Sequence, residues 1–377
     1  LWSESYNRAR SRLIDIQQEV AEAVVQNLEI RLVDRERLLI GRRWTDSTEA
    51  YDEFLRGINL LLGLPDEESL AMSLEHLQRA VELDPDFGRA YARIAIHWVI
   101  AGQFGYAPSK RANDETERLA RQAIELDGEL FEAYWALGWS QLGRYDCPEA
   151  EASFRRVIEL APGNWEGYHS LGWVQGVLGR YDEAMTAAKI AIDLDPLAYY
   201  PRVGMELLYF RQRAYEESIK VTLENAARNG WSDSTRANRV LLLALAGRPD
   251  EARVYLLEVE GENSQDPVVQ LILAMVHSVL GETDRALSLV EPLKQRYLNN
   301  PDQVMPGALA FAYASLGDND QAMEFLLAAR EQEDINLMFL DDAFFDGMRN
   351  DPRFVELIRG LNLPEEIYLS PQYLSSE

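Results

Sequence analysis

Apolar positions recur along this chain with the spacing of amphipathic helices. From residue 10 to about residue 37 they alternate with charged positions at helical spacing: Leu13, Ile16, Val20, Val24, Leu28 and Leu32. The segment Gly41–Asp46 interrupts this pattern, and Asp46 or Ser47 is placed to cap the helix that follows. We therefore expect an amphipathic lead-in helix, a linker, and a first helix that begins near residue 47.

Small residues then recur at a fixed interval, which we call the small-residue series. The first five are equally spaced and the sixth follows slightly later: Ala150, Ala184, Ser218, Ala252, Ala286 and Ala322. A second series, which we call the turn series, runs just ahead in the same phase: Gly179, Arg213, Gly247, Gly281 and Gly317. The interval of about 34 residues is typical of repeated helix hairpins, in which small residues lie where two helices approach closely and glycine with positive φ ends the first helix. Because each hairpin leaves an apolar face uncovered, stability is expected to come from stacking.

The repeating unit resembles the tetratricopeptide repeat. One unit fills every diagnostic position with Ala133-Tyr134-Trp135-Ala136-Leu137-Gly138, Ala150, Phe154 and Pro162, and the next fits equally well from Tyr168 to Pro196. The resemblance implies an all-α, right-handed superhelical solenoid. We predict eight hairpins, at 48–85, 87–128, 130–162, 164–196, 198–230, 232–264, 266–299 and 302–335.

Three regions follow from this division of the chain. Residues 1–46 form the lead-in helix and linker, residues 47–335 the solenoid, and residues 336–377 a C-terminal cap and tail. Asp351 followed by Pro352 is a typical helix start. The short helix predicted from there to about Leu361 is expected to cover the exposed end of the last repeat.

The two ends of the chain carry a more specific resemblance. It rests on Leu1–Tyr6 and Ile16–Ala21 at the start, on Glu49–Gly57, and on Asp351–Phe354 near the end. Together these segments resemble the C-terminal repeat regions of bacterial class III adenylate or guanylate cyclases and of related winged-helix regulators and Ser/Thr kinases. The resemblance implies a regulatory or sensory segment of a larger bacterial signalling protein. Since the chain starts without Met and without a signal peptide, we expect it to be part of a longer protein, with the compartment left open.

Charge narrows the range of partners. The net charge is -26 and the sequence pI is about 4.6, which argues against nucleic acids and anionic membranes, since both are bound by concentrated positive charge. No run of about 18 uncharged apolar residues occurs, so direct membrane insertion by this chain is not expected. Cys147 is the single cysteine, which excludes an internal disulfide.

Motifs for catalysis, metal binding or cofactor binding are absent from the sequence. There is no phosphate-binding glycine loop, no His-Glu-x-x-His and no paired cysteine motif. The four histidines are distributed over different hairpins: His76, His97, His169 and His277. Cys147 is expected to be an inert thiol, and the pair Asp341–Asp342 is attributed to solvated charge and helix capping. We therefore predict no catalytic residue, metal or cofactor, and no enzyme activity within this chain.

Binding is instead expected on the inner surface. In tetratricopeptide repeats the first helix of each hairpin lines a concave groove at about the second, fifth, ninth and twelfth positions. In three successive hairpins these positions hold Glu132, Trp135, Trp139 and Leu142; Glu166, His169, Trp173 and Gly176; and Tyr200, Val203, Leu207 and Phe210. They lack the Lys, Arg and Asn that chaperone-tail binders of this family use. The predicted peptide-binding groove consists of Trp135, Trp139, His169, Trp173, Tyr200, Leu207 and Phe210.

Several alternatives remain open at this point. Trp139 and Trp173 are as well explained by packing between hairpins as by ligand contact. The groove could be occupied by a protein or peptide segment, by the lead-in helix or the C-terminal tail from Tyr368 to Tyr373, or by another copy of the chain. The last case would make the protein a self-association module and a homo-oligomer.

Overall fold

The computed structural model describes residues 23, 42–61, 66–262 and 264–370. In these ranges the chain contains helices and no strand, as the sequence predicts. The lead-in helix predicted from residue 10 to about residue 37 lies outside the described residues, apart from Ala23. The N-cap prediction is confirmed at Ser47, whose side chain accepts a hydrogen bond from the backbone N–H of Ala50.

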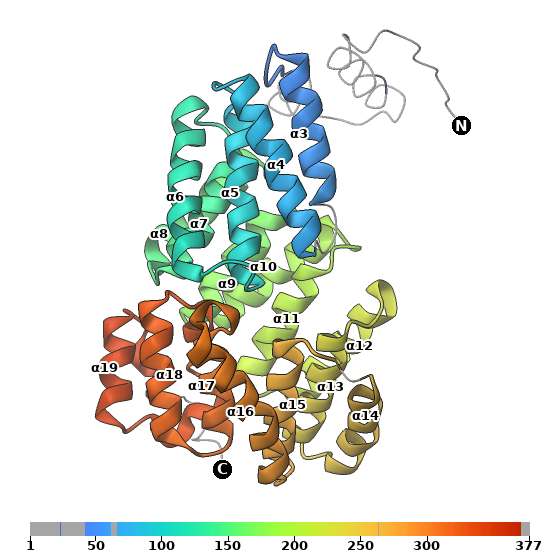
Figure 1. The fold of residues 1–377 in the computed structure, drawn as a ribbon, viewed down its shortest axis with the longest axis vertical. Coiled ribbons are helices and arrows are strands. Elements are labelled where there is room, and N and C mark those ends of the chain that lie inside the picture. Colours follow the sequence, from blue (N-terminus) through green and yellow to red (C-terminus); the bar gives the residue numbers. More distant parts are fainter. Residues whose placement is uncertain (1–22, 24–41, 62–65, 263, 371–377) are drawn as a thin grey trace. The chain divides into compact units, whose positions relative to one another are not determined.

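The helices pair into eight hairpins at the predicted positions (Figure 1). They are α3–α4 (Thr48–Leu60, Glu67–Leu83), α5–α6 (Gly88–Gln103, Ser109–Leu126), α7–α8 (Phe131–Gly143, Cys147–Leu160), α9–α10 (Trp165–Val177, Tyr181–Leu194), α11–α12 (Tyr200–Arg211, Tyr215–Asn229), α13–α14 (Asp233–Leu245, Pro249–Gly261), α15–α16 (Pro267–Val279, Thr283–Asn299) and α17–α18 (Pro306–Ser315, Asn319–Glu331). A short 3-10 turn, η2 (Pro301–Gln303), precedes α17. The last hairpin is followed by η3 (Ile335–Phe339), η4 (Ala343–Met348), α19 (Pro352–Gly360) and α20 (Glu365–Tyr368).

The chain divides into two compact units. The first contains the described residues up to His97 together with Arg118–Ala133, and the second contains Trp98–Glu117 and the chain from Tyr134 onward. In the first unit the rings of Phe54 and Phe87 pack with centroids 5.0 Å apart. The second unit holds most of the hairpins, the C-terminal segment and the inner cavity described below.

Small residues lie at the helix crossings, as predicted. All six members of the small-residue series are fully buried. A Cβ added at Gly138 would lie 2.5 Å from the ring of Phe154, which belongs to the other helix of the same hairpin. The spacing of the repeat therefore reflects close helix contact.

The turn series also has its predicted conformation. Its glycines have φ between 72° and 78°: Gly179, Gly247, Gly281 and Gly317. Arg213 has φ 57° although it is not glycine, and Tyr145, which lies one repeat before Gly179, has φ 63°. A side chain in this left-handed region costs roughly 1 kcal/mol. Two turns thus accept a strained residue where glycine would be free of strain.

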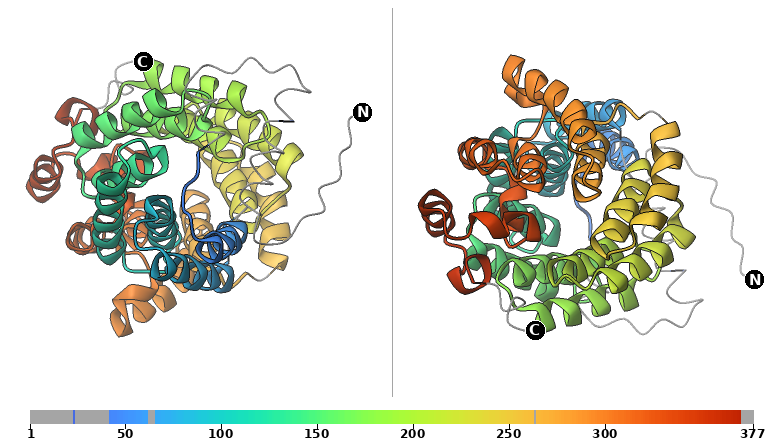
Figure 2. Two further views of the ribbon diagram at one scale, coloured as in Figure 1. Left: turned by 90° about the horizontal axis from the view of Figure 1, so that it is seen from above. Right: turned by 90° about the horizontal axis from the view of Figure 1, so that it is seen from below.

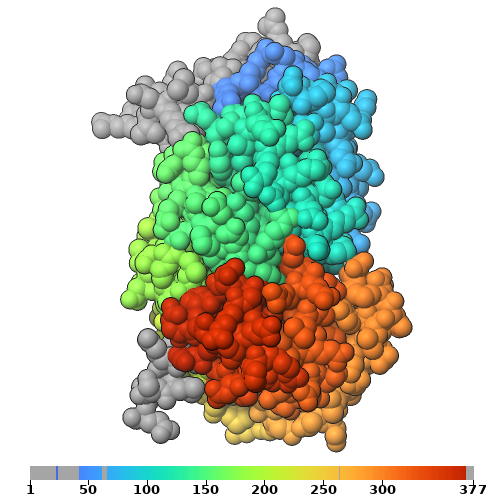
Figure 3. All heavy atoms as spheres, turned by 90° about the vertical axis from the view of Figure 1, so that its left-hand side faces the viewer, coloured from blue at the N-terminus to red at the C-terminus, as the bar shows by residue number. Residues whose placement is uncertain are grey.

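Residues 333–370, which we call the C-terminal segment, fold back within the second unit. The helix α19 packs beside α18, and Arg353 forms an ion pair with Asp320 at 2.8 Å. Seen from below, the helices from α9 to α18 form a curved row, and the segment (red) lies beside its green end (Figure 2). The space-filling view shows the same segment bordering the green hairpins (Figure 3). The C-terminal segment therefore contacts hairpins far from it in sequence.

Candidate functional site

The two strained turn residues hold the C-terminal segment. The hydroxyl of Tyr145 donates a hydrogen bond to the backbone carbonyl of Asp334 at 3.0 Å. The guanidinium of Arg213 binds both carboxylate oxygens of Asp346, at 2.7 and 2.8 Å. These contacts offset the backbone strain, because glycine at either position could make neither of them.

Gly179, between these two turns, is also covered by the C-terminal segment. A Cβ added to Gly179 would lie 2.5 Å from Cγ1 of Ile367 in α20. The later turn glycines meet no atom within 4 Å of such a Cβ: Gly247, Gly281 and Gly317. The segment therefore binds to three consecutive turns of the array, at the hairpins α7–α8, α9–α10 and α11–α12.

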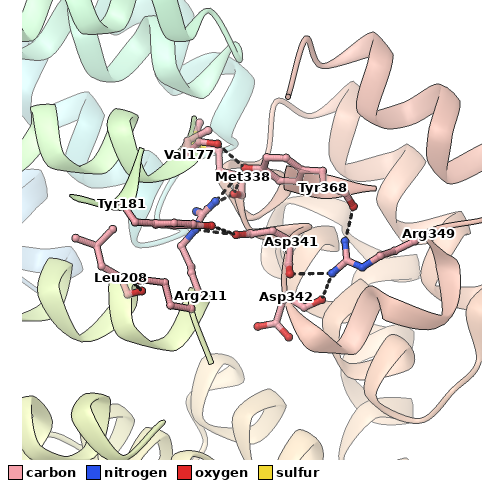
Figure 4. Close-up of polar contacts among 10 residues, drawn as sticks. Val177, Tyr181, Leu208, Arg211, Met338, Asp341, Asp342, Arg349 and Tyr368 are labelled. Atoms are coloured by element: carbon pink, nitrogen blue, oxygen red, sulfur yellow. Dashed lines mark hydrogen bonds and ion pairs between the residues drawn. The ribbon is translucent and has the colours of Figure 1, made fainter. Parts of the chain in front are cut away.

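A buried arginine lies at the centre of this contact (Figure 4). The Nε of Arg211 is 3.0 Å from a carboxylate oxygen of Asp341, and neither residue is more than 4% exposed. The two Nη atoms donate to the carbonyl of Met338 and to the hydroxyl of Tyr368, each at 3.0 Å. The Tyr368 hydroxyl also lies 3.1 Å from the carbonyl of Val177. One side chain of α11 thus connects two parts of the C-terminal segment.

The prediction that Asp341 and Asp342 are solvated is wrong. Their exposed fractions are 1% and 6%, because the fold of the C-terminal segment turns a polar loop toward the interior. Asp341 accepts a hydrogen bond from Tyr181 and pairs with Arg211. The capping part of the prediction is confirmed for Asp342, which accepts from the backbone N–H of Phe344 at the start of η4.

A cavity of about 340 Å³ lies on the inner side of the second unit. We call it the inner cavity. The first helices of five successive hairpins line it, together with η3, η4 and the link between these two turns. The lining residues are Trp173, Val203, Glu206, Leu207, Phe210, Arg211, Asn238, Leu241, Leu242, Val268, Leu271, Ile272, Met275, Ala308, Phe311, Asn336, Phe339, Asp341, Asp342 and Phe344. Its volume lies within the range of about 300–1,000 Å³ that is usual for ligand sites.

Three of the predicted groove residues line the inner cavity: Trp173, Leu207 and Phe210. The other four, Trp135, Trp139, His169 and Tyr200, lie outside its lining. Trp139 is 6% exposed, with its ring between those of Trp135 and Trp173 at 5.9 and 5.5 Å. Trp139 is therefore packed between hairpins. That the seven predicted groove residues bind a peptide stays a prediction.

His169 and Tyr200 border this row of rings. The ring of His169 is 6.4 Å from those of Trp173 and Tyr200. Burial lowers the pKa of His169 to about 3, so its imidazole is neutral at physiological pH. On the other side, the ring of Phe339 lies 5.6 Å from that of Trp173. Phe339 of the C-terminal segment thus covers part of the predicted groove at Trp173. Of the tail considered as an occupant of the groove, Tyr368 contacts Arg211 instead, and residues 371–373 lie outside the described residues.

The remaining wall of the inner cavity could have been found from the sequence. Counting one repeat forward from the groove position Leu207 gives Leu241. Counting two repeats forward from Val203 and Leu207 gives Leu271 and Met275. Each of these residues lines the cavity. Arg211 and the acidic pair Asp341–Asp342, which lies between η3 and η4, carry no such periodic signal.

All three carboxyl groups of the cavity wall, including that of Asp341, have pKa values raised by burial. Burial raises the pKa of Glu206 to about 7, and the hydroxyl of Thr222 partly opposes this shift. Burial likewise raises the pKa of Asp342 to about 7. Within the part of the chain that the structure describes, one carboxylate oxygen of Asp341 and one of Asp342 have no hydrogen-bond partner. These acidic groups are therefore desolvated without full compensation.

We expect the substitution Glu206→Gln to stabilise the protein above neutral pH. The folded chain holds the Glu206 proton up to about pH 7, whereas the ordinary pKa of a free side chain is 4.5. Stability is therefore lost as the pH rises through this window, and the amide does not ionise. Allowing for partial exposure, the gain at about pH 8 is about 1–2 kcal/mol and vanishes below about pH 4.5. Urea unfolding at the two pH values measures it, and an equal gain at both would contradict the assignment.

The other candidate residues lie apart from the inner cavity. His277 contacts Glu282 and Glu260 at 2.8 and 3.0 Å, whereas His76 contacts Glu53 at 2.6 Å. Cys147 is buried at the start of α8, and burial raises the pKa of its thiol to about 11. No group of three or more His, Cys, Asp or Glu side chains in the described ranges could hold a metal ion. Over the same ranges, no helix combines the length and the apolar character needed to cross a membrane.

Comparison with known proteins agrees with this architecture. Residues 234–256 and 267–292, in the hairpins α13–α14 and α15–α16, match the family model of the tetratricopeptide repeat. With eight hairpins and the period of the small-residue series, the fold is an all-α array of helix hairpins. The chain thus contains tetratricopeptide repeats, and arrays of such repeats are scaffolds for protein–protein interaction.

A relative and many solved structures are similar to this chain, among them the following three. It is 31% identical over 156 residues to the "Putative adenylate cyclase 3" of Rhizobium meliloti (strain 1021). The aligned part covers 40% of this chain and 26% of that protein. The chain thus spans about a quarter of that relative's length. A tetratricopeptide repeat protein from Parabacteroides merdae is 13% identical, with 74% of this chain and all of that chain covered and a TM-score of 0.49. Yeast Tom70 is 16% identical, with 94% and 78% covered and a TM-score of 0.48.

Proposed function

We propose that the second unit binds a segment of a partner protein in the inner cavity. The observation that carries this proposal is the shared wall, to which the first helices of five successive hairpins contribute mainly aromatic and aliphatic side chains. Rings such as Trp173 and Phe210 bury a large apolar area with little loss of side-chain entropy. A peptide that places one or two apolar side chains in this cavity would contact several hairpins at once.

We further propose that the chain is the regulatory or sensory segment of a larger bacterial signalling protein. Support comes from the partial similarity to the Rhizobium protein, which is named as an adenylate cyclase. Because the similarity covers about a quarter of that protein, the rest of it can contain an output domain. Binding at the inner cavity would then report the presence of a partner to such a domain.

Selection of peptides from a random library on the full chain tests the binding proposal. Peptides that use the inner cavity should lose at least about 10-fold in affinity when Phe210 is replaced by alanine, since a ring is removed from the wall. The control is Leu257→Ala on α14, where the side chain is 70% exposed. Fluorescence anisotropy gives the affinities, and circular dichroism checks that helicity is unchanged. Equal affinities for the two variants would refute the proposal.

A further inference from the structure

The inner cavity combines aromatic walls with acidic groups. Five rings contribute to the wall: Trp173, Phe210, Phe311, Phe339 and Phe344. Three carboxyl groups contribute as well, from Glu206, Asp341 and Asp342, whereas Arg211 is the one basic residue among the described lining residues. An apolar ligand alone would leave this excess of acidic groups without partners.

Arg211 cannot neutralise more than one of these acids. Its guanidinium is already bound to Asp341, to the carbonyl of Met338 and to the hydroxyl of Tyr368. Across the described residues, no ion pair joins a basic side chain to Glu206 or Asp342. In Figure 4 the carboxyl group of Asp342 points away from Arg349, which binds the backbone carbonyl of Asp342 instead. Glu206, which Thr222 hydrogen-bonds, and Asp342, which accepts from Phe344, thus have no cationic partner among the described residues.

We propose that the inner cavity binds a small amphipathic amine, with its ammonium group beside Glu206 and Asp342 and its apolar body against the aromatic rings. Ring faces attract cations electrostatically, and a desolvated carboxylate strengthens this attraction. The net charge of -26 also favours the approach of cations over anions. A cavity of about 340 Å³ suits a free small molecule.

Binding of the amine is expected to strengthen as the pH rises. Burial holds the pKa of Glu206 and of Asp342 at about 7, so ionisation above this value supplies the negative charge that the ammonium group needs. The charged and titratable groups that face these two carboxyl groups are held in contacts of their own. Arg211 and Asp341 are paired with each other, Arg213 is paired with Asp346, and burial keeps His169 on α9 neutral and raises the pKa of Tyr215 on α12 to about 12. Thr222 on α12 and Asn238 on α13 carry no charge.

Isothermal titration calorimetry of the full chain with phenethylamine tests the proposal, and phenethyl alcohol is the neutral probe of matched shape. We expect one amine per chain, with at least about 10-fold higher affinity than for the alcohol at about pH 8. The substitution Glu206→Gln should reduce this preference at least about threefold, whereas Glu217→Gln, which removes an exposed carboxylate of α12, should leave it unchanged. At about pH 7 amine binding should release protons, which titrations in two buffers detect.

Three results with the amine and the alcohol would overturn the proposal. They are equal affinity for the amine and the alcohol, no binding of either, and an amine preference that Glu206→Gln leaves intact. A capped lysine peptide that binds more tightly than phenethylamine would also overturn it, because the cation would then come from a partner protein. The proposal on partner segments is tested separately, by selected peptides and the variant Phe210→Ala, so either proposal can fail without the other.

Discussion

Replacing Arg211 by methionine is expected to lower the free energy of unfolding of the second unit by about 3–5 kcal/mol. The substitution leaves the Asp341 carboxylate buried without its partner, and both residues are at most 4% exposed in the folded chain. It also removes the donors to Met338 and Tyr368. The C-terminal segment should then dissociate from α11, and limited proteolysis should cleave it faster than in the unchanged protein.

The control for this prediction is the second ion pair of the C-terminal segment. Arg213 and Asp346 are 21% and 30% exposed, so Arg213→Met is expected to cost about 1 kcal/mol or less. Changing both buried partners, Arg211→Met with Asp341→Leu, should recover part of the lost stability because no charge is left unpaired. Urea unfolding monitored by circular dichroism gives the four values. A cost for Arg211→Met no larger than that for Arg213→Met would contradict the assignment.

The second large effect is expected at Gly179. Alanine at Gly179 or at Gly247 meets the same backbone strain, because φ is 72° at both positions. At Gly179 the added Cβ would also lie 2.5 Å from Cγ1 of Ile367, whereas at Gly247 it meets nothing within 4 Å. We therefore expect Gly247→Ala to cost about 1 kcal/mol and Gly179→Ala about 1–3 kcal/mol more.

Thermal and urea unfolding of these two variants measure the difference. The double variant Gly179→Ala with Ile367→Ala should reduce it, since the clash is with the side chain of Ile367. Equal costs at the two glycines would show that α20 does not rest on the turn between α9 and α10.

The array itself was predictable because its signals are periodic. A small residue at each helix crossing and a residue with positive φ at each turn recur once per repeat, so one well-preserved hairpin determines the phase of the others. The same period extends to the lining of the inner cavity at Leu241, Leu271 and Met275. For the helix crossings, the turns and this part of the cavity wall, the local sequence pattern and the tertiary packing indicate the same structure.

The contacts of the C-terminal segment were not predictable in the same way. Arg211 meets Tyr368 across 157 residues, and Tyr145 meets Asp334 across 189, with no repeated pattern to connect them. Acidic residues are usually solvated, and this general rule led to the wrong placement of Asp341. One signal was available in the turn series. Arg213 stands where glycine is favoured, and a residue that breaks a local rule often does so for a tertiary contact.

The central claim is that the inner cavity of the second unit receives a partner segment, and photo-crosslinking tests it most directly. Benzoylphenylalanine introduced at Phe210 places a reactive group in the cavity wall, and the same group at Leu257 on α14 is the control on an exposed surface. A peptide selected on the unmodified chain should crosslink to position 210 and not to position 257. Crosslinking at 257 without crosslinking at 210 would contradict it.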